Sequence, residues 1–79
     1  MISDIREYKH VLEYLEKRGL LEKYSKASAK LLRGETQTVD FKKRQPKNLG
    51  TWSFRIDKKY RAFGTFQKDI LVVFEINDH

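Results

Sequence analysis

The spacing of apolar residues in the first part of the chain predicts a helix over about residues 4–18. Hydrophobic side chains recur there at steps of three and four residues, which is the period of one face of a helix. These residues are Ile5, Tyr8, Val11, Leu12 and Leu15. Asp4 and Glu7 have the spacing of a capping box at the start of this segment, and Gly19 is placed to end it.

A second segment with the same period runs over about residues 20–33. Its inward-facing positions are Leu20, Leu21, Tyr24, Ala27, Ser28, Leu31 and Leu32. Gly34 is placed to end this helix. Because the link between the two helices is so short, we expect an antiparallel helical hairpin whose apolar stripes face the same way.

From Thr36 onward the pattern changes to an alternation of apolar and polar residues, which is typical of β-strands. We expect strands over about residues 37–44, 51–57, 60–66 and 70–77. Helices followed by strands predict an α+β fold. Residues 1–79 would form a single domain in which the helical hairpin packs on one face of a four-stranded antiparallel sheet.

Strand alternation also assigns side chains to the two faces of this sheet, provided that the tight turns keep the register. The even-numbered apolar residues should face the helices: Trp52, Phe54, Ile56, Tyr60, Ala62, Phe66, Ile70, Val72, Phe74 and Ile76. Val39 and Phe41 should join them from the first strand. The opposite face, which we call the open face, would carry Asp40, Lys42, Arg44, Ser53, Arg55, Asp57, Arg61, Phe63, Val73, Glu75 and His79.

Composition restricts the class of protein. A chain of 79 residues with 39% hydrophobic and 13% aromatic residues can form one small core. It has no cysteine, which excludes disulfides and thiolate metal sites and fits the cytosol. No apolar run approaches the roughly 20 residues of a membrane-spanning helix, and the N-terminus lacks a signal-peptide pattern. We therefore expect a cytoplasmic protein that does not contact a membrane.

Positive charge is concentrated in the second half of the chain. Residues 1–35 carry eight basic and six acidic side chains, whereas residues 42–68 carry nine basic side chains and one acidic side chain, Asp57. Such an excess of basic over acidic side chains in one segment indicates a surface that binds a polyanion, and nucleic acid is the default candidate. The alternative is a lysine-rich surface that only keeps the protein soluble.

Two arginines and a histidine on the open face suggest chemistry at a phosphodiester. The guanidinium groups of Arg55 and Arg61 match phosphate oxygens two at a time, and His79 could exchange a proton near neutral pH. Such a set, with no metal ligands, suits RNA cleavage by the RNA's own 2′-hydroxyl. Asp40 and Glu75 are the acids of this face. A surface that only binds phosphate needs the same arginines, and Arg61 could instead form a cross-strand ion pair with Glu75.

The segment WSFRIDKKYRAFG, followed by DILVVFEINDH, resembles the C-terminal half of RelE/ParE-superfamily toxins. It is most similar to the YoeB-like ribonuclease branch of bacterial type II toxin–antitoxin systems. The resemblance covers about residues 40–79. It implies a metal-independent endoribonuclease that needs no cofactor, cleaves mRNA on the ribosome and is neutralised by a small, acidic antitoxin.

The resemblance also implies roles for particular residues. Arg61 takes the place of a phosphate-stabilising arginine, His79 that of a general-acid histidine, and Arg55 that of a second strand arginine. Lys42, Lys43 and Arg44 lie in the region where relatives carry either a glutamate base or RNA-binding lysines. Apart from the resemblance, Lys58 and Lys59 at the hairpin tip would suit a phosphate backbone and are the other expected RNA-binding residues.

The sequence departs from the superfamily pattern at three points. The superfamily begins with a β-strand, for which the first residues, MIS, are too short. The glutamate base of relatives has no clear counterpart, so Asp40, Glu75 or a lysine with a lowered pKa would have to replace it. Many relatives continue beyond the histidine. Two alternatives therefore stay open: a domain that binds RNA or an antitoxin without cleavage, and a ParE-like gyrase inhibitor.

Overall fold

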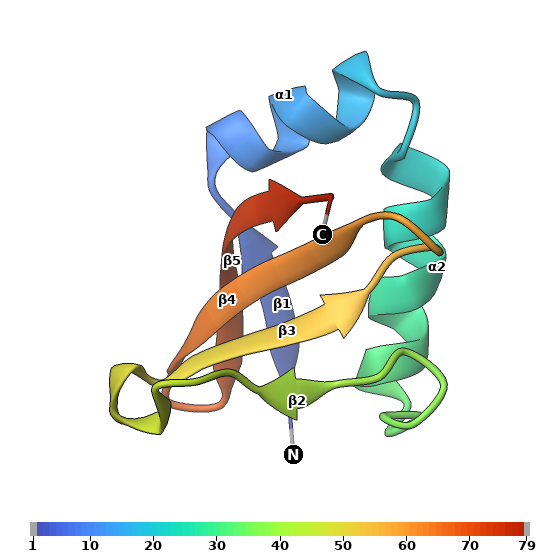
Figure 1. Ribbon diagram of the computed structural model, residues 1–79. Helices are drawn as coiled ribbons and strands as arrows, with labels where there is room; N and C mark the ends of the chain where they lie inside the picture. The colour runs from blue at the N-terminus through green and yellow to red at the C-terminus, as the bar shows by residue number, and fades with distance from the viewer. Residues whose placement is uncertain (1, 79) are drawn as a thin grey trace.

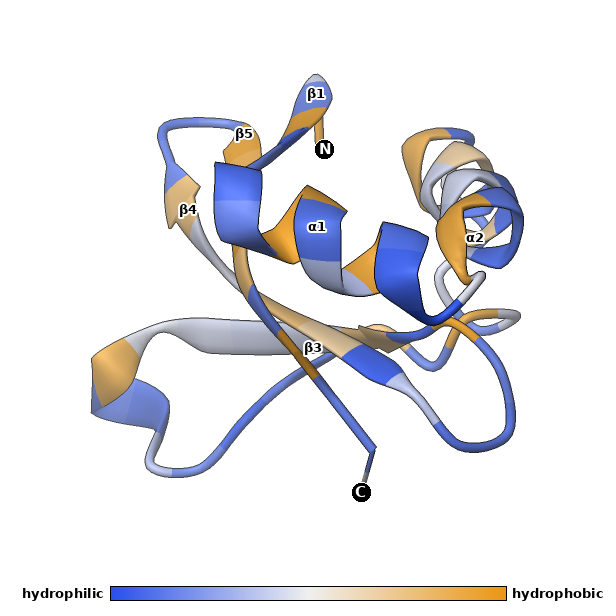
Figure 2. Cartoon of the chain, turned by 90° about the horizontal axis from the view of Figure 1, so that it is seen from above, coloured by the Kyte–Doolittle hydropathy of each residue, from blue (hydrophilic) through white to orange (hydrophobic). Residues whose placement is uncertain are grey.

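The computed structural model describes residues 2–78, which form a five-stranded sheet covered by two helices (Figure 1). The strands lie in the order β1-β5-β4-β3-β2, and both helices lie on the same side of the sheet (Figure 2). The elements are β1 (Asp4–Glu7), α1 (Lys9–Lys17), α2 (Leu21–Leu32), β2 (Lys42–Lys43), the 3-10 helix η1 (Lys47–Leu49), β3 (Thr51–Arg55), β4 (Arg61–Gln67) and β5 (Ile70–Asn77). The predicted α+β fold is confirmed, although the sheet has a fifth strand.

The additional strand is β1, where we predicted the first turn of a helix. It pairs in parallel with β5, with Ile5 beside Leu71, so the sheet is mixed and not antiparallel throughout. Asp4 and Glu7 make no capping box: the Asp4 carboxylate accepts from the backbone N–H of Ile5 at 2.8 Å, and α1 begins only at Lys9. Ile5 fits both a helical and a strand period. The segment forms a strand because the backbone N–H and C=O groups along the edge of β5 require hydrogen-bond partners, which β1 supplies.

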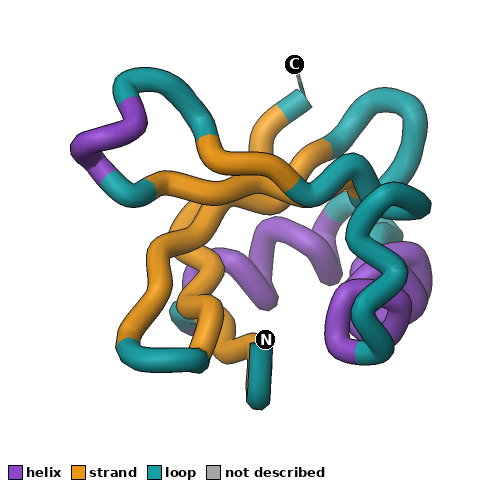
Figure 3. Tube along the Cα trace, turned by 90° about the horizontal axis from the view of Figure 1, so that it is seen from below, coloured by secondary structure: helices purple, strands orange, loops and turns teal. Residues whose placement is uncertain are grey.

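The strand predicted over residues 37–44 is reduced to Lys42 and Lys43. A loop precedes it, in which Asp40 adopts a left-handed conformation with a φ of 49°. Aspartate tolerates this conformation better than most residues, because its short polar side chain can hydrogen-bond locally. The loop is joined to the sheet, since the backbone N–H of Arg55 donates to the carbonyl of Val39 at 2.6 Å. Val39 is buried, as predicted. Figure 3 shows that the segment between β2 and β3, which contains η1, projects from the body of the sheet.

A β-bulge changes the faces along β5. The pairing of β4 with β5 shifts between Phe63 and Gly64, which leaves Phe74 as an extra residue. One extra residue reverses the alternation, so odd-numbered positions of β5 face the core before the bulge and even-numbered positions face it after the bulge. Leu71 and Val73 are therefore buried in the core, in place of the predicted set Ile70, Val72 and Phe74. The carbonyl of Phe74 accepts a hydrogen bond from Nε2 of His10 at 2.8 Å, which ties the bulge to α1.

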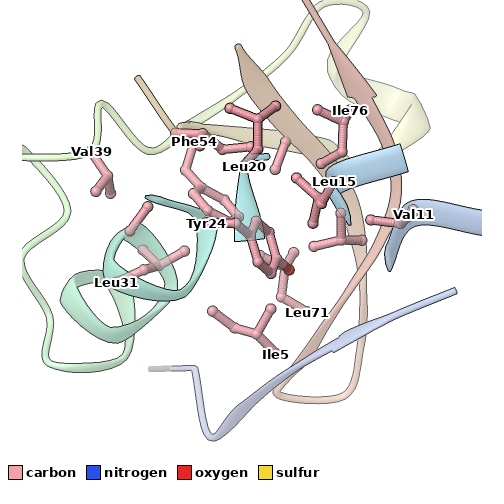
Figure 4. Packing of buried hydrophobic residues seen from close by; sticks show 14 residues of the cluster. Ile5, Val11, Leu15, Leu20, Tyr24, Leu31, Val39, Phe54, Leu71 and Ile76 are labelled. Carbon is pink, nitrogen blue, oxygen red and sulfur yellow. The ribbon is translucent and has the colours of Figure 1, made fainter. Parts of the chain in front are cut away.

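The core lies between the helices and the sheet (Figure 4). Val11 and Leu15 of α1 are buried, as are Tyr24, Ala27 and Leu31 of α2, so the predicted inner stripes of both helices are confirmed at these positions. Tyr8 and Leu12 near α1, and Leu21 and Leu32 of α2, are exposed, although the helical period included all four. The hydroxyl of Tyr24 donates to the Glu7 carboxylate at 2.7 Å, which joins α2 to β1. Burial, together with this hydrogen bond, raises the pKa of Tyr24.

Candidate functional site

Three basic side chains converge on one carboxylate oxygen of Asp40. Nη1 of Arg61 donates to Oδ2 at 3.0 Å, while Nζ of Lys42 and Nη2 of Arg55 lie 3.5 Å and 3.9 Å from the same oxygen. We call these four residues the Asp40 cluster. Three positive charges around one negative charge leave an excess that an anion of the size of a phosphate could neutralise.

Arg61 is held more firmly than the other two basic residues of the cluster. Its Nη2 donates both to the backbone carbonyl of Asp40 and to Oγ of Ser53, each at 2.8 Å, and its Nε donates to Ser53 at 3.3 Å. Only 12% of the Arg61 side chain is exposed, compared with 54% of Arg55. Arg61 is therefore fixed in one orientation, whereas the guanidinium group of Arg55 is open to solvent.

The pairing of the strands brings these residues together. Arg55 and Arg61 are direct neighbours across the β3–β4 pair, and Lys42 of β2 lies opposite Ser53. The side chains of these four strand residues, Arg55, Arg61, Lys42 and Ser53, therefore share the open face. Asp40 reaches them from the loop before β2. The backbone of a hairpin and its neighbouring strand places these residues side by side, and the Arg61 side chain is already ordered before any ligand binds, which favours binding.

The carboxylate of Asp40 is stabilised in its charged form. Partial burial acts to raise its pKa, but the hydrogen bond from Arg61 and the charges of Lys42 and Arg61 outweigh burial, so the net effect lowers the pKa. The carboxylate is therefore ionised at neutral pH. A carboxylate with a lowered pKa is a good partner for cations and a weak acceptor of protons.

The lowered pKa makes the Asp40 cluster sensitive to acid. A carboxylate whose pKa is lower in the folded chain stabilises the fold above its unfolded pKa, about 4, and loses this effect as the pH falls. We expect wild type to melt at a higher temperature than Asp40→Asn above about pH 5, and the difference to shrink below about pH 4. Circular dichroism melts from neutral to acidic pH measure this difference. A difference that stays constant with pH would contradict the prediction.

Other predicted site residues surround the cluster or lie apart from it. The guanidinium carbon of Arg44 lies 5.6 Å from the ring centre of Phe63, on the open face. Lys43 lies opposite Trp52 in the strand pairing and so belongs to the other face. Lys58 and Lys59 are exposed at the β3–β4 turn, where Oδ1 of Asp57 accepts from the backbone N–H of Lys59 at 2.9 Å.

Glu75 does not belong to the Asp40 cluster. The alternative of an ion pair between Arg61 and Glu75 is contradicted, because Arg61 lies opposite Asn77 in the strand pairing and contacts Asp40 instead. Glu75 accepts a hydrogen bond from Nδ2 of Asn77 at 2.9 Å. His79, the predicted general acid, lies outside the described residues.

The sequence pattern predicts no role for Ser53 beyond its place on the open face. Its side chain is fully buried and accepts two of the hydrogen bonds that orient Arg61. The alternation of side chains along the strand could have indicated this role. It places Ser53 on the same face as Arg55, and the Ser53 side chain is too small to fill that face alone. Within residues 2–78, no group of three or more His, Asp or Glu side chains is arranged to hold a metal ion. None of the helices described is long and apolar enough to span a bilayer.

The comparisons with known proteins identify the fold. No protein-family model matches the chain, and no curated protein sequence matches it. Among solved structures, the chain is similar to the YoeB/ParE toxin from Agrobacterium tumefaciens, with a TM-score of 0.60 over 96% of this chain and 98% of that chain. The two sequences are 17% identical, so the likeness is one of fold. The chain therefore has the fold of a YoeB/ParE toxin, as the resemblance of its C-terminal half implied.

Proposed function

We propose that the chain is the toxin of a type II toxin–antitoxin system and that it cleaves mRNA on the ribosome. The observation that carries the proposal is the convergence of Arg55, Arg61 and Lys42 on one oxygen of Asp40, on a fold shared with a YoeB/ParE toxin. A phosphodiester offers the same kind of oxygen to the same cations.

The proposed reaction uses the 2′-hydroxyl of the RNA as the nucleophile. A base takes the proton of this hydroxyl, the 2′-oxygen bonds to phosphorus, the bond from phosphorus to the 5′-oxygen breaks, and an acid protonates that leaving oxygen. The products are a 2′,3′-cyclic phosphate and a 5′-hydroxyl. Arg55 and Arg61 would hold the negative charge that develops on the phosphate oxygens. The bonds and protons of this reaction balance without any further reactant.

The roles of base and acid belong to the proposal as well. Asp40 or Glu75 would take the proton, and a lysine of the basic surface is the other candidate. His79 would supply the proton to the leaving oxygen. His79 follows by two positions Asn77, the residue paired with Arg61. Lys43, Arg44, Lys58 and Lys59 would bind neighbouring phosphates of the RNA.

The proposed partner is a small, acidic antitoxin that covers this basic surface. In the part of the chain that the structure describes, both outer strands of the sheet, β1 and β2, have one edge without a neighbouring strand. Such edges accept an added strand from another chain. An apolar groove of about 560 Å³ lies near β2 and is lined by aromatic residues that include Phe41, Trp52 and Phe66. An antitoxin with acidic and apolar residues would complement both features.

A second candidate function, binding of RNA without cleavage, is favoured by the state of the Asp40 cluster. The described contacts of Arg61 use four of its five N–H groups. The pKa of Asp40 is lowered, which makes it a weak base. A cluster of this kind could hold a phosphate through Arg55 and Lys42 and carry out no chemistry.

Incubation of the purified chain with a synthetic mRNA, with and without ribosomes, separates these functions. We expect cleavage that depends on ribosomes, mapped by primer extension, with products that end in a cyclic phosphate and a 5′-hydroxyl. Intact mRNA together with tight, salt-sensitive RNA binding would select the second function. Intact mRNA together with inhibition of DNA supercoiling by gyrase would select the ParE-like alternative and overturn both.

A further inference from the structure

A second basic surface is formed where α2 approaches β3. A groove of about 180 Å³ lies between Lys23, Lys26 and Lys30 of α2 on one side and Thr38 and Arg55 on the other. We call it the α2 groove. Arg55 belongs both to this groove and to the Asp40 cluster. The distribution of charge along the sequence does not indicate this groove, because residues 1–35 are nearly balanced in charge.

The three lysines of the α2 groove lie on one side of the helix. Positions 23, 26 and 30 are three and four residues apart, which places them in one row. At 1.5 Å per residue the row is about 10 Å long. An anion that binds along it must therefore be extended and carry more than one charge.

Most of the charge on this row is available to a ligand. Lys23 has a partner, Asp57, at 3.3 Å. The pair between Lys26 and Glu22 is long, at 3.9 Å, and the two side chains are 73% and 84% exposed. Exposed pairs of this kind contribute little and are easily exchanged. Lys30 takes part in none of the ion pairs found within residues 2–78.

We propose that the α2 groove binds the phosphate backbone of the RNA strand whose neighbouring phosphate occupies the Asp40 cluster. This inference rests on the proposed function, since it takes RNA as the ligand. Arg55 lines both surfaces, so a single strand that passes Arg55 can contact the cations of the Asp40 cluster and those of the α2 groove. Lysines are point charges that contact phosphates and do not read bases, so binding here is independent of sequence.

The shape of the groove favours RNA over an acidic peptide. Its apolar lining consists of Ala27, Val39 and Ile56, which are buried in the core of the protein itself. A peptide that docks by its apolar side chains needs an exposed apolar surface in the groove. In the α2 groove the apolar residues are buried, and the basic side chains are what a ligand can contact.

Salt dependence of RNA binding tests the inference. For a single strand, each phosphate contact contributes about 0.7 to the slope of log K against log salt. The triple variant Lys23→Gln, Lys26→Gln, Lys30→Gln should therefore lower the slope by about 2, measured by fluorescence anisotropy with an oligouridylate of about 12 nucleotides. Glutamine keeps the helix propensity of lysine. The single variant Lys30→Gln should lower the slope by about 0.7 and serves if the triple variant does not fold.

A matched control keeps the effect of position apart from the effect of net charge. The variant Lys9→Gln, Lys17→Gln, Lys68→Gln removes three exposed lysines outside the groove. We expect its slope to stay close to that of wild type. Equal slopes for the two triple variants, with RNA bound by wild type, would overturn the groove inference and leave the proposed function standing. A wild-type chain that binds no RNA would overturn both. An unchanged slope combined with loss of binding to an acidic peptide would assign the groove to a protein partner.

Discussion

Replacement of Arg61 by alanine should abolish mRNA cleavage and also destabilise the fold, whereas replacement of Arg55 should abolish cleavage alone. Arg61 is nearly buried and orients Asp40 and the buried hydroxyl of Ser53. Its loss leaves polar groups without partners, at a cost of about 1–3 kcal/mol. Arg55 is half exposed, and its contact with Asp40 is 3.9 Å long, so its removal should cost at most about 1 kcal/mol.

The same pair of variants should reveal the part that charge stabilisation plays in catalysis. Loss of one group that stabilises the charge of the transition state typically lowers the rate by about 100-fold or more. Rates of ribosome-dependent cleavage and urea denaturation together measure the two effects. Arg6→Ala is the matched control, since Arg6 is 69% exposed on β1 and, among residues 2–78, its ion-pair partner is Asp4 alone. Full activity of Arg55→Ala, or wild-type stability of Arg61→Ala, would refute this division of roles.

The second large effect concerns the docking of α1. Leu15 is completely buried, and α1 packs chiefly against β5. We expect Leu15→Ala to lower the free energy of unfolding by about 2–5 kcal/mol, because it removes buried methyl groups and leaves a cavity. That is a large part of the total stability of a domain of this size. The melting temperature should fall by about 10 °C or more.

Leu49→Ala is the control for this substitution, because it removes the same atoms from a side chain that is 65% exposed in η1. We expect it to change the stability by no more than about 0.5 kcal/mol. Equal effects of the two substitutions would mean that α1 does not dock through Leu15.

Features that depend on neighbouring residues could be predicted from the amino-acid pattern. The helical period of α1 and α2 indicates Val11, Leu15, Tyr24, Ala27 and Leu31 as core residues, and all five are buried. The turn between β3 and β4 is short, so alternation alone brings Arg55 and Arg61 to one face, where they are direct neighbours. Local spacing suffices in both cases, because the period of a helix or a hairpin is set by its own backbone.

Features that join distant segments were decided by the folded chain. The strand β1 forms because β5, 66 residues later, offers an edge: Asp4 lies beside Ile70. The bulge at Phe74 changes which residues of β5 face the core. The pattern of apolar and polar residues within β5 does not predict this bulge. Arg61 pairs with Asp40 and not with Glu75 because a loop in an unusual backbone conformation carries Asp40 to it.

The basic surface shows the same division. The sequence alone revealed the excess of positive charge after residue 42 and the two strand arginines, because both are properties of a continuous segment. Only the packing of α2 beside β3 brings Lys30 into a groove with Arg55, although the two residues are far apart in the chain. Contacts of this kind arise from the burial of one shared core, whose free energy depends on all the elements at once.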